Sequence, residues 1–242
     1  DNERSAYRFK SNAIQNSIYG VDIDAGAVEI AKLRLWLSMV VDEERINTIE
    51  PLPNLEYKIV RGDSLISIPF DSARDVQLED EINQLTTQFY TITDKTQKQE
   101  QKEIIDSKIK LLLESASEYT GYKIDFDFKL FFHEVFNDNG GFNVVIGNPP
   151  YIGQKGNSPL FAKMKHDPNF EKKMDYWYFF LYKSQSISAK GGITSFITPN
   201  YWITARGARI LRKKITKEFY FHEWINFNDN NVFEAGIHTN VF

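Results

Sequence analysis

The segment 143–152, Asn-Val-Val-Ile-Gly-Asn-Pro-Pro-Tyr-Ile, constrains the fold of this chain more than any other stretch. The three consecutive β-branched residues 144–146 predict a strand that is buried on both faces, like a central strand of a parallel sheet. Gly147 ends this strand, and the two prolines after Asn148 predict a stiff, extended loop. Because ligands of open α/β sheets bind at the carboxyl ends of strands, we expect Asn148 and Tyr151 at the mouth of a site.

Composition excludes several classes of protein. Of the 242 residues 42% are hydrophobic, which is enough for a core. The chain has no cysteine and its four histidines are scattered, so we expect no disulfide, no cysteine nucleophile and no metal site. No apolar run approaches the roughly 20 residues that cross a bilayer, and the first residues do not form a signal peptide. A cytoplasmic protein without a membrane partner is therefore the default expectation.

Charge is distributed unevenly along the chain. The net charge is -4, but residues 155–217 contain 13 Lys or Arg and three acids, which gives 13 - 3 = +10 there and -4 - 10 = -14 elsewhere. Such asymmetry is typical of a surface that faces phosphates, although solvated helix faces also produce it. Lys155, Arg206 and Arg209 are the candidate residues within this stretch for contact with nucleic-acid phosphates.

Two short strands each end at an acid. Residues 18–21 predict a strand followed by Asp22, and apolar residues at helical spacing then predict a helix for which Asp24 is a plausible N-cap. A carboxylate at such a strand end typically accepts hydrogen bonds from a ribose, so Asp22 is the ribose candidate. The alternative is that both acids only cap the helix.

The second of these strands is Tyr57–Arg61, and it precedes Gly62, Asp63 and Ser64. The basic residues within it predict a position near a sheet edge. Asp63 stands where a carboxylate could accept from an exocyclic amine, although Gly-Asp is also an ordinary turn pair.

The remaining stretches predict further elements of one α/β domain. Residues 71–122 predict an inserted helical hairpin, and the Phe-rich residues 126–136 predict core packing. An irregular loop is expected over Gly153–Asn169, then an aromatic helix that ends near Lys190–Gly192. A strand over Ile193–Ile197, a basic helix with Arg206 and Arg209, and a C-terminal antiparallel strand pair complete the expected order.

Together these residues resemble the S-adenosylmethionine-dependent amino-methyltransferases, and within them the N6-adenine DNA methyltransferases of restriction-modification systems, especially the fused Type IIG enzymes. Asn148-Pro149-Pro150-Tyr151 matches the family's catalytic tetrapeptide. Residues 20–24 resemble its ribose-binding acid with an apolar neighbour against adenine, and Gly62-Asp63 resembles its adenine-reading acid. The segments 191–200 and 232–233 resemble later motifs.

The resemblance implies a Rossmann-like fold, a mostly parallel sheet and specific roles. Asn148 and the Pro149 carbonyl would accept the two N–H bonds of an adenine amine, which makes its nitrogen lone pair available without a general base. Tyr151 and Phe233 would stack on an adenine flipped out of double-stranded DNA. The residues implied for S-adenosylmethionine are Asp22, Ile23, Asp63, Ser64 and Asn148.

The family's glycine-rich first motif is absent, so we expect its strand upstream of Asp1. The resemblance also implies further domains of the same polypeptide, such as a nuclease domain before this one and a DNA-recognition domain after it. Such a piece is expected to bind S-adenosylmethionine weakly or not at all in calorimetry. Two alternatives stay open: a methyltransferase that modifies a release-factor glutamine or a ribosomal RNA guanine, which shares the tetrapeptide, and a noncatalytic DNA-binding module with the same fold.

Overall fold

The computed structural model describes residues 6–41, 54–69, 74–165, 167–227, 232 and 238–242. The chain divides into two compact units, unit 1 (Asp1–Glu134) and unit 2 (Val135–Phe242), and each is described by itself. Both contain helices and strands, so the chain is a mixed α/β protein, as the sequence predicts.

In unit 1, two short strands form a small parallel sheet, and an acidic residue stands at or just after the end of each. Helix α1 (Ala6–Ser17) precedes β1 (Gly20–Asp22), and α2 (Ala25–Val40) precedes β2 (Ile59–Arg61). β1 and β2 are parallel, with Asp22 opposite Arg61. Val28 and Met39 on α2 pack with Ile14 and Ile59 in a shared apolar core, so the helix is held against the strands whose ends carry the acids.

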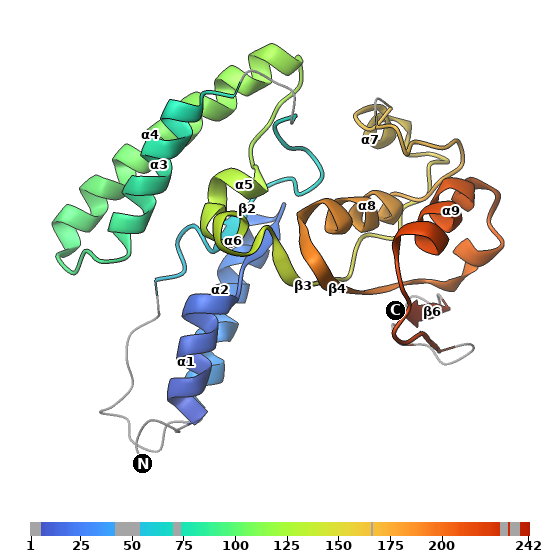
Figure 1. Cartoon of the computed structure of the whole chain (residues 1–242), viewed down its shortest axis with the longest axis horizontal. Helices are drawn as coiled ribbons and strands as arrows, with labels where there is room; N and C mark the ends of the chain where they lie inside the picture. The colour runs from blue at the N-terminus through green and yellow to red at the C-terminus, as the bar shows by residue number, and fades with distance from the viewer. Residues whose placement is uncertain (1–5, 42–53, 70–73, 166, 228–231, 233–237) are drawn as a thin grey trace. The chain divides into compact units, whose positions relative to one another are not determined.

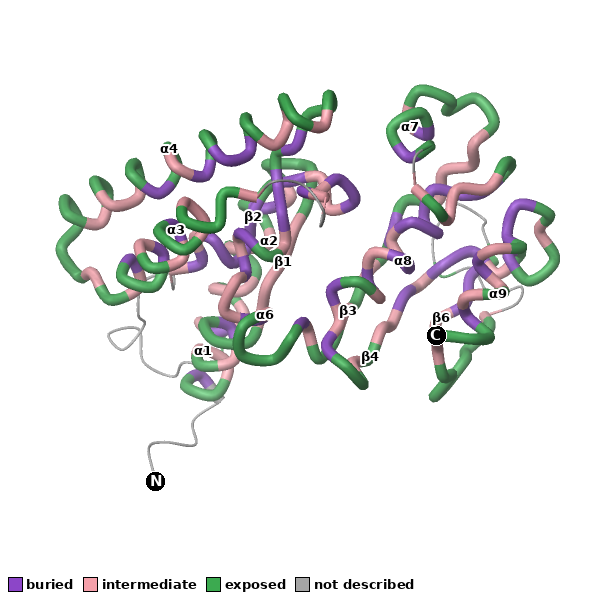
Figure 2. Tube along the Cα trace, turned by 45° about the horizontal axis from the view of Figure 1, so that its top comes forward, coloured by how far each residue is buried: buried purple, intermediate pink, exposed green. Residues whose placement is uncertain are grey.

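The expected helical hairpin is present in unit 1, where α3 (Val76–Phe89) lies beside α4 (Lys95–Thr120) (Figure 1). Asp94 caps α4 by accepting from the Gln97 N–H, and Gly121 ends it in the left-handed region with φ 75°. Buried positions recur along α4 between exposed ones (Figure 2). This alternation is the amphipathic pattern that the sequence predicts.

A buried lysine lies just before β2. Lys58 is 6% exposed, and its ammonium is 3.0 Å from Glu134 Oε1 and stacks over the Tyr19 ring. Tyr19 also donates a short hydrogen bond to Glu134. β2 is an outer strand of the two-stranded sheet that the described residues form, as the sequence predicts. A carboxylate and an aromatic ring compensate the burial of the lysine before it. Helix α5 (Phe128–Phe131) and Phe132 carry the expected aromatic packing around the fully buried Phe126, and α6 (His133–Asn139) follows them.

Unit 2 is built on a mixed sheet with the order β3-β4-β6-β5. β3 (Phe142–Gly147) and β4 (Ser188–Pro199) are parallel, whereas β6 (Thr239–Val241) is antiparallel to both β4 and β5 (Ile225–Asn226). The expected C-terminal antiparallel pair is thus confirmed. The parallel crossover from β3 to β4 contains α7 (Ser158–Ala162) and α8 (Trp177–Ile187).

Three expectations about unit 2 are wrong. β3 is not buried on both faces: Val144 and Ile146, which point to the same face, are 58% and 77% exposed. β3 is also an outer strand, not a central one, of the sheet formed by the described residues. The loop 153–169 contains α7, in which Phe161 is buried and Pro159 occupies the first turn. α8 ends at Ile187, and the residues 190–192 lie within the span of β4.

The segment after β4 turns sharply back toward the sheet. It forms η3 (Asn200–Ile203), η4 (Arg206–Ala208) and α9 (Arg209–Glu218). Arg212 holds this turn together, because its Nη1 donates to the Trp202 carbonyl at 2.8 Å and the Ala205 carbonyl at 2.7 Å. These bonds satisfy backbone carbonyls that the short helices leave open.

Candidate active site

The tetrapeptide 148–151 begins where β3 ends. β3 and β4 are paired through Gly147 and Phe196, so Asn148 emerges beside Ile197. Asn148 is exposed and Pro149 is buried. The Tyr151 hydroxyl oxygen lies 3.1 Å from Asn148 Oδ1 and 3.0 Å from the Ile197 carbonyl oxygen. Burial raises the pKa of Tyr151 above its ordinary value of 10.0, so the phenol keeps its proton at neutral pH.

Two carbonyls of the loop differ in availability. The Pro150 carbonyl accepts the Ile152 N–H at 3.0 Å. The Pro149 carbonyl accepts no hydrogen bond within the described part of the chain. An acceptor without a partner therefore stands directly after the Asn148 amide, on a backbone that proline stiffens.

The loop after the tetrapeptide pairs with the segment that leads into α8. Tyr176 N–H donates to the Ile152 carbonyl at 2.8 Å, and Gln154 N–H donates to the Met174 carbonyl at 3.2 Å. Between them Gly153 and Asp175 form an isolated antiparallel bridge. This pairing fixes the loop from its C-terminal side.

Asp175 is a buried carboxylate that the sequence reasoning counted only as one of three acids in a basic stretch. It is 8% exposed, and its Oδ2 has no hydrogen-bond partner among the described residues. Burial raises the pKa of Asp175, and the neighbouring Tyr201 and Trp177 side chains act in the opposite direction. The signal available in the sequence was an acid directly before an aromatic run within a stretch otherwise rich in cations.

The acids of unit 1 come together at one edge of its sheet. The Gly62 N–H donates to the Asp22 carbonyl at 2.9 Å, which continues the parallel ladder and places both strand ends side by side. Asp22 Oδ1 accepts from the Asp24 N–H, and Asp24 Oδ1 accepts from the Ala27 N–H, each at 2.8 Å. Asp24 is therefore the N-cap of α2, as expected, while one oxygen of Asp22 remains available.

The second acid is oriented by its own turn. Asp63 Oδ1 accepts from the Leu65 N–H at 3.1 Å, and the Asp63 N–H donates to Asp125 Oδ1 at the same distance. A β-carbon on Gly62 would lie 2.2 Å from Phe126 Cβ, so only glycine fits before this acid. Ser64 is half-buried in the same turn.

These side chains fit the adenosine part of S-adenosylmethionine in their chemistry. Asp22 and Asp63, at neighbouring strand ends, supply acceptors for ribose hydroxyls and for an adenine amine. Ile23 follows Asp22 directly and is 65% exposed, so an aromatic ring could cover it. A groove of about 460 Å³ runs along β1 and α2 and includes Asp22.

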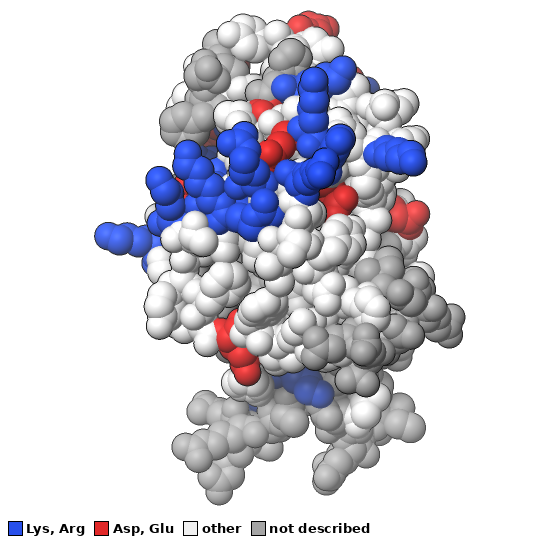
Figure 3. Space-filling view, turned by 90° about the vertical axis from the view of Figure 1, so that its right-hand side faces the viewer, with Lys and Arg blue, Asp and Glu red and all other residues white. Residues whose placement is uncertain are grey.

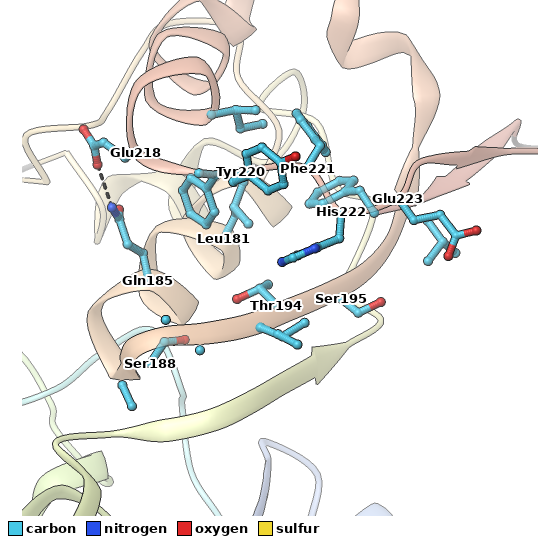
Figure 4. A pocket seen from close by; sticks show the side chains of 18 of the residues that line it. Leu181, Gln185, Ser188, Thr194, Ser195, Glu218, Tyr220, Phe221, His222 and Glu223 are labelled. Carbon is cyan, nitrogen blue, oxygen red and sulfur yellow. Dashed lines mark hydrogen bonds between the residues drawn. The ribbon is translucent and has the colours of Figure 1, made fainter.

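A larger cavity of about 500 Å³ lies in unit 2 between β4, the end of α9 and the residues that follow it (Figure 4). Gln185 Nε2 donates to Glu218 Oε2 at 2.7 Å on one side, and His222 projects toward β4 on the other. None of the residues that the sequence assigned to a site lines this cavity.

The predicted site residues fall into two groups. Asp22, Ile23, Asp63 and Ser64 belong to unit 1; Asn148, Pro149, Pro150, Tyr151, Lys155, Arg206 and Arg209 belong to unit 2. Phe233 lies outside the described residues. In unit 1 the structure places the strand ends that carry Asp22 and Asp63 side by side. In unit 2 it brings Tyr151 to Asn148. The cofactor contact of Asn148 and the DNA contacts of Lys155, Arg206 and Arg209 stay predictions.

Within the described ranges, no group of three or more His, Asp or Glu side chains is arranged to hold a metal ion. No described helix has the length and the apolar character needed to cross a membrane.

The fold and the tetrapeptide point to a restriction-modification methylase, and comparison with known families agrees. The Eco57I restriction-modification methylase family matches residues 16–233, and the chain belongs to this family. The match includes both acid-bearing strands of unit 1 and the tetrapeptide of unit 2.

Individual relatives are named as type II enzymes. RM.Eco57I of Escherichia coli, a type II restriction enzyme and methyltransferase, is 24% identical over 94% of this chain and 18% of its own length. The type II methyltransferase M.HincII of Haemophilus influenzae is 34% identical over 43% of this chain and 22% of its length. A putative type II restriction enzyme and methyltransferase of Methanocaldococcus jannaschii is 49% identical over 26% of the chain and 6% of its length. The chain thus spans less than a quarter of each of these relatives.

Proposed function

We propose that this chain is the catalytic methyltransferase domain of a type II restriction-modification enzyme and that it methylates the N6 amine of adenine in double-stranded DNA. The hairpin α3–α4 is an insertion in that single Rossmann-like domain. Membership of the Eco57I family supports the reaction class. The observation that carries the proposal is the geometry of the tetrapeptide at the end of β3.

In this proposal two acceptors receive the target amine. Asn148 is exposed, and the Pro149 carbonyl has no partner among the described residues, so both can accept an N–H of the amine. Accepting both bonds draws the nitrogen toward tetrahedral geometry and frees its lone pair for attack. The prolines hold these acceptors before the substrate arrives.

The Tyr151 hydroxyl has a single proton, and two acceptors lie within its reach. When it donates to the Ile197 carbonyl, Asn148 Oδ1 is left for the substrate. The ring of Tyr151 would stack on an adenine that has left the duplex, and Phe233 is proposed to cover the opposite face.

S-adenosylmethionine would supply the methyl group when bound. Asp22 would accept the ribose hydroxyls, Ile23 would lie against the adenine ring, and Asp63 with Ser64 would read the adenine amine. The remaining partners that we propose are further domains of the same polypeptide, including a nuclease, because two of the relatives are named restriction enzyme and methyltransferase.

The decisive experiment incubates the full-length protein with S-adenosylmethionine labelled in the methyl group. Three acceptors are compared: adenine-containing duplex DNA, a release factor and ribosomal RNA. Label in the DNA, recovered as N6-methyladenine after digestion, is the expected result. Label in the release factor or RNA alone would identify another amino-methyltransferase, and DNA binding without any transfer would identify a noncatalytic module.

A further inference from the structure

Cations of unit 2 gather on one face of the molecule (Figure 3). Lys and Arg side chains form a band there with few acids among them. The exposed cations of η4, of the first half of α9 and of the segment before α8 define what we call the basic surface: Lys172, Lys173, Arg206, Arg209 and Lys213.

Some cations near this face already have partners inside the protein. Arg212 donates to two backbone carbonyls, and Lys214 is paired with Glu218 at 3.0 Å. Arg209 is paired with Glu171 at 3.2 Å. These three are held by the fold, which restricts their reach toward a ligand.

Other cations of the basic surface have no such partner. Lys172, Lys173, Arg206 and Lys213 make no ion pair with an acid in the described part of the chain. Unpaired like charges on one surface repel one another, and a bound polyanion offsets that repulsion. The surface therefore has the electrostatic character of a phosphate-binding site rather than of a network of ion pairs.

The backbone beneath these cations is held rigidly. Glu171 accepts from the Ile210 N–H at 2.9 Å and so caps the first turn of α9. A β-carbon on Gly207 would lie 2.0 Å from the Lys173 carbonyl oxygen, so η4 packs directly on the backbone of Lys173. The backbone of Lys173 itself has φ 67°, a conformation that residues other than glycine rarely adopt.

The same segment contacts the loop that carries the tetrapeptide. The Gln154 side chain accepts from the Lys173 N–H, and the Gln154 N–H donates to the Met174 carbonyl at 3.2 Å. Only two residues separate Gln154 from Tyr151. Backbone hydrogen bonds thus connect the basic surface directly to the proposed catalytic loop.

We propose that Lys172, Lys173 and Arg206 bind DNA phosphates that flank the methylated adenine. This inference rests on the proposed function for the identity of the anion as DNA. The hydrogen bonds to Gln154 explain why these phosphates are the ones beside the target: the cations and the tetrapeptide are parts of one connected loop structure.

The first test measures the salt dependence of DNA binding by the full-length protein. Each phosphate contact contributes about 0.9 to the slope of log K against log salt concentration. Replacing Lys172, Lys173 and Arg206 together by Ala is expected to reduce that slope by about 2 to 3. The matched control replaces Lys95, Lys110 and Lys123 of unit 1 by Ala, which removes the same charge and is expected to leave the slope unchanged.

Equal slopes for the two triple variants would overturn the inference. Its failure is distinguishable from failure of the proposed function: a protein that binds DNA but transfers no methyl group contradicts the function, while the slopes still decide the phosphate contacts. A protein that does not bind DNA overturns both.

The second test locates the phosphates. Neutral methylphosphonates replace the phosphates on either side of the modified adenine in a duplex that carries the methylated sequence. They are expected to weaken binding of the unaltered protein by about tenfold or more and to have little further effect on the triple variant, because the same contacts are already lost. Independent, additive losses would place the contacts elsewhere on the DNA and contradict the proposal.

Discussion

The Tyr151 hydroxyl oxygen lies 3.1 Å from the amide oxygen of Asn148, and it lies equally near the Ile197 carbonyl on the neighbouring strand. When the hydroxyl donates to Ile197, it ties the tyrosine of the tetrapeptide to β4 and leaves the Asn148 oxygen without this donor. The two side chains are therefore separable by mutation, since the amide is the proposed acceptor of the substrate amine and the hydroxyl orients the Tyr151 ring.

We expect Asn148→Ala to abolish methyl transfer, a loss of at least about a hundredfold, because an acceptor aligned with the reacting amine is removed. The side chain is exposed, so the free energy of unfolding should hardly change. The measurement is transfer of labelled methyl groups to DNA by the full-length protein. The control is Asn143→Ala, which removes an exposed amide near the start of β3 and should leave the protein active. Unchanged turnover of Asn148→Ala would contradict the assignment of Asn148 as the acceptor.

Tyr151→Phe keeps the ring and removes the hydroxyl. Losing one orienting hydrogen bond costs about 1 to 1.5 kcal/mol, which corresponds to about a tenfold decrease in kcat. Tyr151→Ala also removes the proposed stacking surface and should raise KM for DNA as well. Kinetics of both variants separate the two roles, and equal behaviour of Phe and Ala would show that the ring does not contact the base.

Asp22 and Asp24 are separated by one residue and have different expected roles. Asp22→Ala should weaken S-adenosylmethionine binding to the full-length protein by about 10- to 100-fold, because a carboxylate that accepts ribose hydrogen bonds is lost. Asp24→Ala should instead lower stability by about 1 kcal/mol through loss of the N-cap. Calorimetry and thermal unfolding of the two variants measure this contrast, and equal losses of affinity would refute the ribose assignment.

The Lys58–Glu134 pair predicts an acid-sensitive contribution to stability. Burial alone would raise the pKa of Glu134, but hydrogen bonds from Tyr19 and Lys58 outweigh it and lower the pKa below the ordinary 4.5. A lowered folded-state pKa means that the stabilisation is present above the unfolded-state pKa and is lost as the pH falls through the folded-state pKa. Stability at neutral pH therefore includes a contribution that disappears in acid.

Glu134→Gln should remove that contribution. We expect a loss of about 1 to 2 kcal/mol at neutral pH, in the lower part of the range for unpaired buried charges because 35% of the Glu134 side chain is exposed. The difference from the unaltered protein should shrink as the pH falls below the ordinary glutamate value. Urea denaturation at several pH values measures it, with Glu118→Gln as an exposed control; a difference that is constant with pH would contradict the explanation.

Much of the local structure follows from local sequence. The cap Asp24, the two helices of the hairpin and the C-terminal antiparallel pair all depend on neighbouring residues, and they occur where expected. The exposure of Val144 and Ile146 on β3 was not predictable in this way. Apolar side chains indicate that a strand tends to be buried, but they do not indicate which other element packs against it.

The partners of individual charged side chains could not be predicted from a local sequence pattern either. Lys58 and Arg61 predict a strand near a sheet edge, and β2 is an outer strand of the sheet that the described residues of unit 1 form. Only the fold shows that Lys58 is buried beside Glu134. Arg209 was predicted to contact DNA, and in the structure it also pairs with Glu171, an acid that the sequence showed only as one of three.

The sequence by itself determined which chemical groups stand at the strand ends: a β-branched strand, a glycine and two prolines are followed by an amide and a phenol, and two short strands are followed by acids. These features need only neighbouring residues. Only the tertiary structure decided that Tyr151 reaches the Ile197 carbonyl 46 residues away and that Glu171 caps a helix 39 residues later. Such contacts depend on how the chain closes its loops, and the distances that result are not encoded in any single segment.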